Sequence, residues 1–410
     1  MTTIVKNISE LVGVTAPDVL RRQGMEMSDV GLVRHAYLLI EDDRIAGYGP
    51  MTAMPQQEAD CVIDAKDCVV MPSFCDSHTH IVYAGQRDGE FIDKINGLSY
   101  EEIAARGGGI LCSSDHLHAT SEDELFAQSL SRVREMVAAG TGAIEIKSGY
   151  GLTPPDELKM LRVIRRLREA TPALIRSTFL GAHAIGRGYT HEGYVDSVIR
   201  EMLPAVAAEG LADFVDVFCD EGFFTVADTD RILTAAHALG IRPKIHANEL
   251  AVSGGVQVGV KHGALSVDHL ERTTDAEIEA LRGSTTMPTM LPGSSFFLGL
   301  PYGRAKDFVA AGLGVALASD YNPGSSPSGD MRFVMAMGCI RMRLTPEQAL
   351  NACTLNSAYA MGVSDEVGSI AVGKRANVIV TSQPTLGRIT YLHHTPFIAQ
   401  HIVGGRVVSA

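Results

Sequence analysis

Several features that mark whole classes of protein are missing from this 410-residue chain. Its 7 cysteines are odd in number and contain no Cys-x-x-Cys pair, so we expect free thiols in a reducing compartment instead of a disulfide framework. No stretch approaches the roughly 18 apolar residues that span a membrane. The first residues show no long apolar run after a basic start, which argues against a signal peptide. We therefore expect a cytoplasmic protein without a membrane partner.

Positive charge is also scarce. The chain has 35 Lys and Arg against 48 Asp and Glu, a formal net charge of −13. Affinity for nucleic acid comes mostly from Lys and Arg that neutralise phosphates, so we expect no nucleic-acid partner. A Gly-x-Gly-x-x-Gly motif at a first strand end and a P-loop are absent as well, which disfavours an open nucleotide-binding sheet. Hydrophobic residues make up 46% of the chain, enough for a packed core.

What is present, between residues 70 and 362, is an alternation of apolar strands and amphipathic helices. The segments expected to be strands are residues 69–76, 142–150, 173–183, 213–220, 242–247, 265–270, 284–289 and 314–320. Each is followed by a helical segment, which is the βα repeat of a parallel, TIM-like (β/α)8 barrel. Both chain ends are instead short β-rich runs broken by turns. The sequence thus predicts an α/β protein, with a barrel over residues 71–363 and a small β domain from residues 1–70 and 364–410.

Polar side chains cluster where the predicted strands end. They are His78 and His80, His183, His246 with Glu249, His269, and Asp320. Catalytic groups of barrel enzymes gather at the carboxyl ends of several different strands. We therefore expect these residues, which are distant in sequence, to meet in one site.

His78 and His80 alternate along one strand, so both side chains face the same side and can bind one ion. His246 is the candidate third imidazole ligand and Asp320 the candidate carboxylate ligand. Each alone is more often a buried, hydrogen-bonded residue. Their joint occurrence at the ends of strands one, five and eight favours a metal site, of a kind that suits zinc or iron.

A metal ion lowers the pKa of its bound water from about 16 to about 7, which makes hydroxide available at neutral pH for attack on a carbonyl or amidine carbon. His269, at the end of strand six, is expected close to the ion, where it can hold this water or take its proton. Asp320 can do the same with the oxygen that does not bind the metal. The pattern therefore predicts a hydrolase.

Longer strings of residues make the pattern recognisable. In order across nearly the whole predicted barrel they are DSHTHIVYAGQRDGEF, GGGILCSS, EIKSGYGL, FLGAHA, VDVFCDEGFF, KIHANEL, SVDHLE and SDYNPGSSP. With them the chain resembles the amidohydrolase superfamily and, within it, the imidazolonepropionase family. The resemblance implies hydrolysis of 4-imidazolone-5-propanoate to N-formimidoyl-L-glutamate, a step of histidine degradation. It also implies that the two β-rich ends form one small β-sandwich domain, and superfamily analogy suggests a homodimer.

The resemblance also assigns site residues. One Zn²⁺ or Fe³⁺ ion per subunit is expected on His78, His80, His246 and Asp320. The residues expected to contact the substrate are Arg87, Tyr100, Tyr150, His183, Glu249, His269, Asn322, Gly324 and Ser325. The residues expected to act in catalysis are Glu249, His269, Asp320 and His183.

Elementary chemistry is consistent with several of these roles. The planar fork of Arg87 suits the propionate carboxylate, although an ion pair with Asp88 or Glu90 is an equal alternative. Glu249 can pass a proton to the ring nitrogen as the C–N bond breaks. His183 can hydrogen-bond the carbonyl oxygen that becomes the oxyanion.

The number of ions follows from a missing lysine. Members of the superfamily with two metal ions carry a carbamylated lysine at the end of strand four. Here strand four is VDVFCDEGFF, without lysine, and Lys147 lies at the end of strand two. We therefore expect a single ion. Two departures from the usual motifs, Phe74-Cys75 in place of Gly-Phe and Asn248 in place of Asp, fall on residues that are not proposed ligands.

Two other interpretations remain open. Another cyclic amidohydrolase, or a deaminase of a heteroaromatic ring, would carry almost the same metal ligands, but Arg87, Tyr150 and Asn322 suit a substrate with a free carboxylate. A superfamily member that has lost its ligands and acts as a binding or assembly protein is disfavoured, because all four ligands are present.

Overall fold

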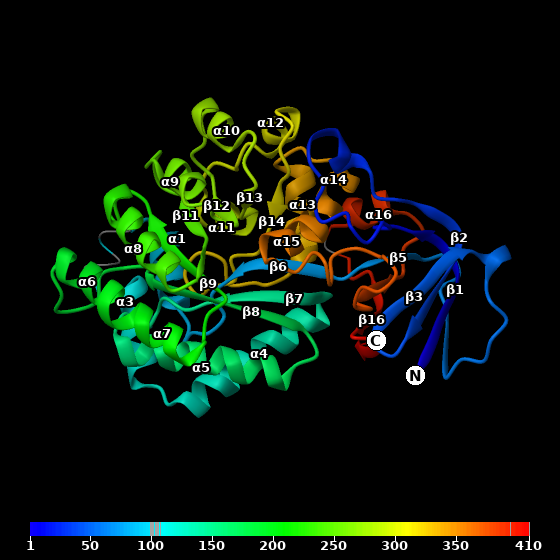
Figure 1. Ribbon diagram of the computed structural model, residues 1–410, viewed down its shortest axis with the longest axis horizontal. Helices are drawn as coiled ribbons and strands as arrows, with labels where there is room; N and C mark the ends of the chain where they lie inside the picture. The colour runs from blue at the N-terminus through cyan, green and yellow to red at the C-terminus, as the bar shows by residue number, and fades with distance from the viewer. Residues whose placement is uncertain (99–101, 103–105, 107, 394, 410) are drawn as a thin grey trace.

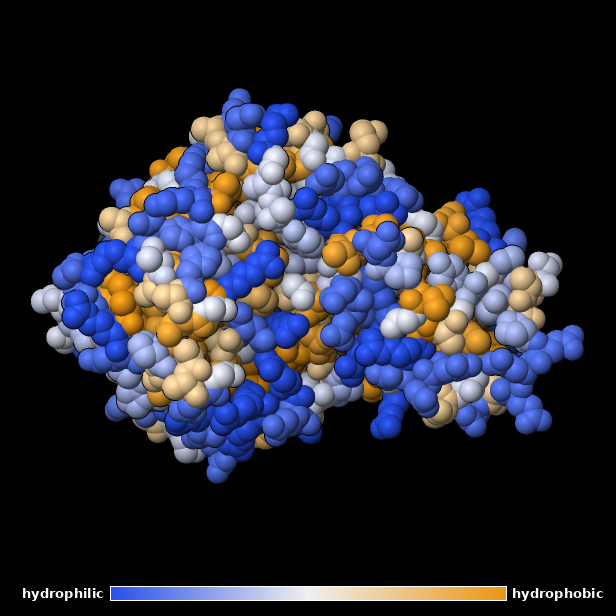
Figure 2. All heavy atoms as spheres, in the orientation of Figure 1, coloured by the Kyte–Doolittle hydropathy of each residue, from blue (hydrophilic) through white to orange (hydrophobic). Residues whose placement is uncertain are grey.

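The computed structural model of the chain describes residues 1–98, 102, 106, 108–393 and 395–409. Figure 1 shows two parts, a ring of strands surrounded by helices and a smaller sheet at the right that holds both termini. On the face seen in Figure 2, hydrophilic and hydrophobic residues are interspersed, as on most globular proteins. Within the described residues, no helix is both long and apolar enough to cross a membrane.

Parallel strands form the ring, in the order β6-β7-β8-β9-β11-β12-β13-β14. Their bounds are β6 Phe74–Thr79, β7 Thr141–Lys147, β8 Leu174–Ala182, β9 Phe214–Cys219, β11 Ile245–Ala247, β12 Ser266–His269, β13 Met287–Met290 and β14 Ala316–Leu317. The short β10, Arg242–Pro243, precedes β11 and pairs with β9. Because neighbouring strands are paired in parallel, all of them end at the same edge of the ring.

Contacts between the first strand and the segment after β14 nearly close the ring. Thr79 forms a parallel bridge with Tyr321, and the backbone N–H of Asp320 donates to the carbonyl of His78 at 3.0 Å. This closure places Asp320 beside the strand of His78, although the two residues lie far apart in sequence.

The eight expected barrel strands are confirmed, but two of them are divided. Residues 242–247 form β10 and β11, which are separated at Lys244. The expected strand over residues 69–76 is divided into β5, Val69–Pro72, and β6. β5 pairs with β1 and β15 in the terminal sheet, so the chain passes from that sheet into the barrel at Ser73. β5 straddles the boundary predicted at residue 70, and the domain limits themselves stay predictions.

Most helices follow barrel strands and cover the outside of the ring (Figure 1). Their bounds are α1 Asp88–Ile95, α3 Ile110–Ala119, α4 Glu122–Ala138, α5 Pro154–Ala170, α6 His191–Ser197, α7 Leu203–Glu209, α8 Val226–Ala238, α9 Gly255–Lys261, α10 Asp275–Leu281, α11 Pro292–Leu298, α12 Ala305–Ala310, α13 Met331–Ile340, α14 Pro346–Cys353, α15 Leu355–Ala360 and α16 Leu386–Tyr391. Local chemistry fixes several helix starts. At α14, Gln348 N donates to the Thr345 hydroxyl and Pro346 lies in the first turn.

Both chain ends contribute to the terminal sheet, which has the order β17-β16-β15-β5-β1-β2-β3, with β4 paired to β1. The remaining bounds are β1 Thr2–Leu11, β2 Val33–Glu41, β3 Arg44–Pro50, β4 Cys61–Asp64, β15 Val378–Thr381, β16 Ile398–Val403 and β17 Arg406–Ser409. Val5, Leu38 and Val378 belong to a core of this sheet that is distinct from the barrel core. The expectation that both ends build one β domain is confirmed.

Candidate active site

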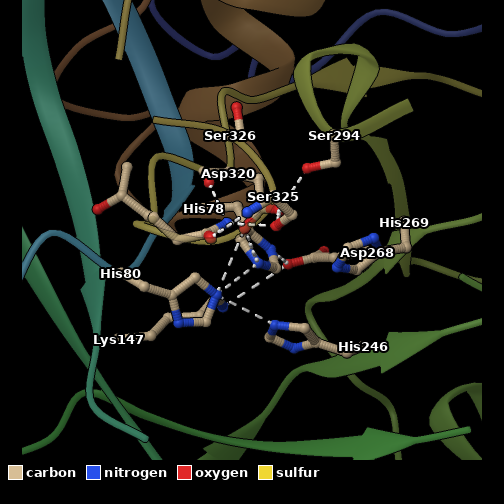
Figure 3. Close-up of polar contacts among 12 residues, drawn as sticks. His78, His80, Lys147, His246, Asp268, His269, Ser294, Asp320, Ser325 and Ser326 are labelled. Atoms are coloured by element: carbon tan, nitrogen blue, oxygen red, sulfur yellow. Dashed lines mark hydrogen bonds and ion pairs between the residues drawn. The ribbon is translucent and has the colours of Figure 1, made fainter. Parts of the chain in front are cut away.

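The carboxyl ends of the barrel strands bring three imidazoles together. His78 and His80 alternate on β6, and His246 lies on β11. His80 Nε2 lies 3.2 Å from His78 Nε2 and 3.3 Å from His246 Nε2. All three side chains are buried, and Figure 3 shows them pointing toward one another.

Two buried carboxylates determine which nitrogen of the His78 and His246 rings faces this centre. Asp268 Oδ2 lies 2.7 Å from His78 Nδ1, and Asp216 Oδ2 lies 2.9 Å from His246 Nδ1, the latter outside hydrogen-bond alignment. A carboxylate beside Nδ1 favours the proton there, which leaves Nε2 with a lone pair. Burial and the Lys147 ammonium lower the pKa of His78 well below its usual range, and burial lowers the pKa of His246 to about 3. The rings are therefore neutral, the state that binds a metal.

The Asp320 carboxylate faces the same centre. Its Oδ1 has no hydrogen-bond partner among the described residues, and it lies 3.6 Å from His78 Nε2 and 3.5 Å from His80 Nε2. Its Oδ2 accepts from the hydroxyl of Ser294 and, at 3.3 Å, from that of Ser325. The backbone of Asp320 is left-handed, with φ of 54°, a strained conformation of the kind found at functional sites.

This set of donor atoms fits a metal ion. Converging lone pairs and a buried, unpaired carboxylate oxygen repel one another unless a cation lies between them. The candidate ligand atoms of His78, His80 and His246 lie within 4.8 Å of one another, as do those of His78, His269 and Asp320. The site therefore supports a metal cofactor held by imidazoles and a carboxylate.

A network of buried charged side chains lies beneath the histidines, and it was not predicted from the sequence. Lys147 Nζ donates to Glu145 Oε1 at 2.7 Å and to Asp216 Oδ2 at 2.8 Å, and Lys244 donates to the other oxygen of Glu145. All four side chains are fully buried. Lys147 is thus engaged by carboxylates, and the network holds the carboxylate beside His246 in place. Polar residues alternating within the apolar strand β7 are the signal that could have indicated it.

His269, at the end of β12, lies between two glutamates. Its Nε2 is 3.6 Å from Glu249 Oε2, and its Nδ1 is 3.4 Å from Glu271 Oε2. Burial opposes a charged ring, but the two glutamates outweigh it and raise the pKa of His269 well above its usual range. Burial raises the pKa of Glu249 to about 7. Glu271 is not among the residues predicted from the sequence, although its place just past the end of β12 is a usable signal.

His183 follows β8 and stacks on His80, with ring centroids 5.2 Å apart. Its Nδ1 lies 3.0 Å from the carbonyl oxygen of Gly149, which can only accept, so Nδ1 carries the proton. Burial lowers the pKa of His183 to about 4, so the ring is neutral and its Nε2 has a lone pair. Tyr150 lies 5.4 Å from His183 between ring centroids, and burial keeps its hydroxyl protonated by raising its pKa.

Arg87 lies above the barrel at the start of α1. Its Nε and Nη2 donate to Glu90 at 2.9 and 2.6 Å, so the ion pair with Glu90 is present, and contact of Arg87 with the substrate stays a prediction. The guanidinium also lies against Gly324, where a Cβ would stand 2.2 Å from Arg87 Nη1. Asn322 shapes this turn, because its Oδ1 accepts from Gly324 N and Ser325 N at 2.8 Å each.

Most predicted site residues line one cavity of about 830 Å³. They are His80, Arg87, Tyr150, His183, His246, Glu249, His269, Asp320, Asn322, Gly324 and Ser325. Tyr100, also predicted, lies outside the described residues. The prediction missed Lys94, which also lines this cavity. It also missed an aromatic wall that includes Phe218 and Phe297, because apolar side chains give no chemical signal in a sequence.

Comparisons with known proteins identify the family of this chain. The model of the amidohydrolase family matches residues 69–408. An imidazolonepropionase of Christiangramia forsetii is 51% identical, and one of Flavobacterium johnsoniae is 50% identical, each over 100% of this chain and 100% of the relative. A solved triazine hydrolase variant shares the fold, with a TM-score of 0.76 at 14% identity over 100% of this chain and 94% of that one. The chain therefore belongs to the amidohydrolase family and, within it, to the imidazolonepropionases.

Proposed function

We propose that this chain hydrolyses 4-imidazolone-5-propanoate to N-formimidoyl-L-glutamate. The observation that carries the proposal is the convergence of neutral imidazoles with Asp320 Oδ1 in a cavity that also holds the Arg87 guanidinium. A cyclic amide with a propionate tail needs both a hydrolytic centre and a cation. The full-length relatives named imidazolonepropionase support this choice of substrate.

The proposed cofactor is one Zn²⁺ or Fe³⁺ ion per subunit on His78, His80, His246 and Asp320, a ligand set that suits either ion. When bound, the ion supplies Lewis-acid polarisation and hydroxide at neutral pH. The contribution of the chain is to keep these ligands buried, with neutral rings aimed at one point.

Glu249 and His269 are the proposed proton carriers. With a pKa of about 7, Glu249 can accept a proton from the attacking water and deliver it to the ring nitrogen as the C–N bond breaks. His269 is held as a cation by Glu249 and Glu271, so it can donate a hydrogen bond to the developing oxyanion. The Oδ2 atom of Asp320 is engaged by Ser294, so Asp320 acts mainly as a ligand.

His183 and Tyr150 are proposed to orient the ring. Nδ1–H of His183 donates to the carbonyl oxygen of Gly149, so Nε2 can accept a hydrogen bond from an N–H of the substrate. This role replaces the expectation that His183 donates to the oxyanion. Arg87, beside the turn at Gly324, binds the carboxylate of the substrate.

The test follows the absorbance of imidazolonepropanoate with purified protein, with N-formimidoyl-L-glutamate as the expected product. Turnover of guanine or another neutral heteroaromatic ring, without turnover of imidazolonepropanoate, would contradict the proposal and favour a deaminase. Metal analysis of protein purified without chelators assigns the ion. Protein without an ion, and without activity after zinc or iron is added, would favour a binding protein.

We also propose that the chain works in the cytoplasm as a homodimer. All seven cysteines are free thiols, which supports a reducing compartment. The dimer rests on superfamily analogy, and sedimentation equilibrium of the native protein tests it.

A further inference from the structure

Lys94 lies on the same face of α1 as Arg87 and Glu90. The three residues are spaced at i, i+3 and i+7, which turns their side chains the same way. Lys94 lines the cavity of the proposed active site, and its ammonium donates to the carbonyl oxygen of Gly324 at 3.0 Å. Gly324 therefore meets both cations, because its Cα faces the guanidinium of Arg87.

The charges on this face of α1 do not cancel. Arg87 and Glu90 form a bidentate pair with no net charge. Glu90 also accepts from the backbone N–H of Gly109 at 2.9 Å, so its carboxylate is fully engaged. Lys94 forms no ion pair with any residue that the structure describes. The net positive charge of this corner of the cavity is therefore that of Lys94.

The surroundings of Lys94 make its charge available to an anion. The ammonium lies 5.6 Å from the ring centroid of Phe297, and that ring stacks on Phe91. Aromatic neighbours leave an ammonium group less hydrated. A carboxylate that reaches it is therefore attracted more strongly than it would be in open water. Burial and the nearby guanidinium of Arg87 lower the pKa of Lys94, and the carboxylate of Glu90 only partly opposes them.

We infer that Lys94 is a further binding residue for the carboxylate of the substrate and that it selects ring substrates with an acidic tail. The inference rests on the proposed function, whose substrate carries such a tail. The planar guanidinium of Arg87 orients the carboxylate, but Glu90 neutralises its charge. The compact ammonium of Lys94 supplies the positive charge that the carboxylate needs. An uncharged heterocycle gains nothing from Lys94.

The test compares a charged and a neutral ligand on the metal-loaded protein. The probes are imidazole-4-propanoate and imidazole-4-propanamide, which share ring and tail and are not hydrolysed at the ring, and calorimetry measures their Kd values. We expect Lys94→Gln to weaken binding of the propanoate about 10-fold or more, as for a lost charge-assisted bond, and binding of the propanamide less than about twofold. Lys94→Arg keeps the charge and should retain most of the preference. The control Lys306→Gln removes the same charge from an exposed position of α12 and should change neither Kd.

Two outcomes would overturn the inference. Equal weakening of both probes by Lys94→Gln would show a structural role, and unchanged binding of both would show that Lys94 does not meet the carboxylate. A folding defect is not expected, because α1 buries none of its residues. A wild-type protein that prefers the propanoate through Lys94 but does not hydrolyse imidazolonepropanoate would support the carboxylate site and refute the proposed function, so the two failures are distinguishable.

Discussion

At the scale of single residues, the role of each side chain depends on which of its polar atoms is left without a hydrogen-bond partner in the protein and can bind a metal or the substrate. The sequence predicts that His183 and Asp320 meet in one site, because each follows a barrel strand. It does not predict that the proton of His183 is held by Gly149, or that one oxygen of Asp320 is held by Ser294. Those partners come from other segments of the chain, so only the folded geometry determines the roles.

The unequal duties of the two Asp320 oxygens can be tested by substitution. Asp320→Ala removes a ligand, and we expect kcat/KM for imidazolonepropanoate to fall by about 10³-fold or more, together with the bound metal. Ser294→Ala removes one of the two hydroxyls that donate to Oδ2, and the expected loss is about 10- to 100-fold with metal retained. Steady-state kinetics and metal analysis of both variants check this. Near-normal kcat in Asp320→Ala would refute the proposed mechanism.

The lack of a side chain at Gly324 leaves room for the guanidinium of Arg87. A Cβ at Gly324 would stand 2.2 Å from Nη1 of Arg87, so Gly324→Ala must displace the guanidinium. Because the displaced group is the end of a flexible side chain, we expect little change in Tm but a rise in KM of about 10-fold, with a smaller effect on kcat. Gly89→Ala is the matched control, since a Cβ at Gly89 meets nothing within 4 Å and should leave KM unchanged. An unaltered KM in Gly324→Ala would mean that the position of Arg87 is unimportant for binding.

At the scale of elements, the repeat of strands and helices could be predicted from the sequence, but the role of buried charged residues within single strands could not. The βα alternation predicts every barrel strand, because each is a short segment that contains or adjoins apolar residues and is followed by a helical segment. Glu145 and Lys147 on β7 look misplaced in such a buried strand, since their partners Asp216 and Lys244 come from other segments of the chain. Helix α1 is a similar case, because none of its residues is buried and its role depends on the cavity beside it.

The network across β7 and β9 predicts a large stability effect. Lys147→Met leaves Glu145 and Asp216 buried with one cation fewer, and an uncompensated buried charge costs about 3–5 kcal/mol. Urea denaturation of the metal-loaded protein should show this loss in the free energy of unfolding. Lys261→Met breaks an ion pair whose lysine side chain is 65% exposed, and it should change stability little. Similar losses in the two variants would mean that the buried network does not hold the barrel strands together.

At the scale of the whole molecule, the sequence predicts that both chain ends form one β domain, but not how that domain is attached to the barrel. The attachment includes His401 on β16, which is fully buried. Its Nδ1 donates to the carbonyl oxygen of Val137 at the end of α4. Its Nε2 accepts, at 2.8 Å, from the hydroxyl of Ser73, which lies between β5 and β6. One imidazole thus joins the terminal sheet to the residue that precedes the first barrel strand and to a helix of the barrel.

This junction makes stability depend on pH in a defined direction. Burial lowers the pKa of His401 to about 4, whereas the unfolded chain protonates this residue near pH 6.5. Between these values the unfolded state holds more protons, so the free energy of unfolding falls as the pH falls, by up to about 3 kcal/mol from this residue. His401→Gln cannot titrate, so the wild-type advantage seen at pH 8 should shrink between pH 6.5 and 4. Urea denaturation of both proteins at several pH values isolates His401 from the histidines of the active site, and parallel pH profiles would show that the junction does not titrate.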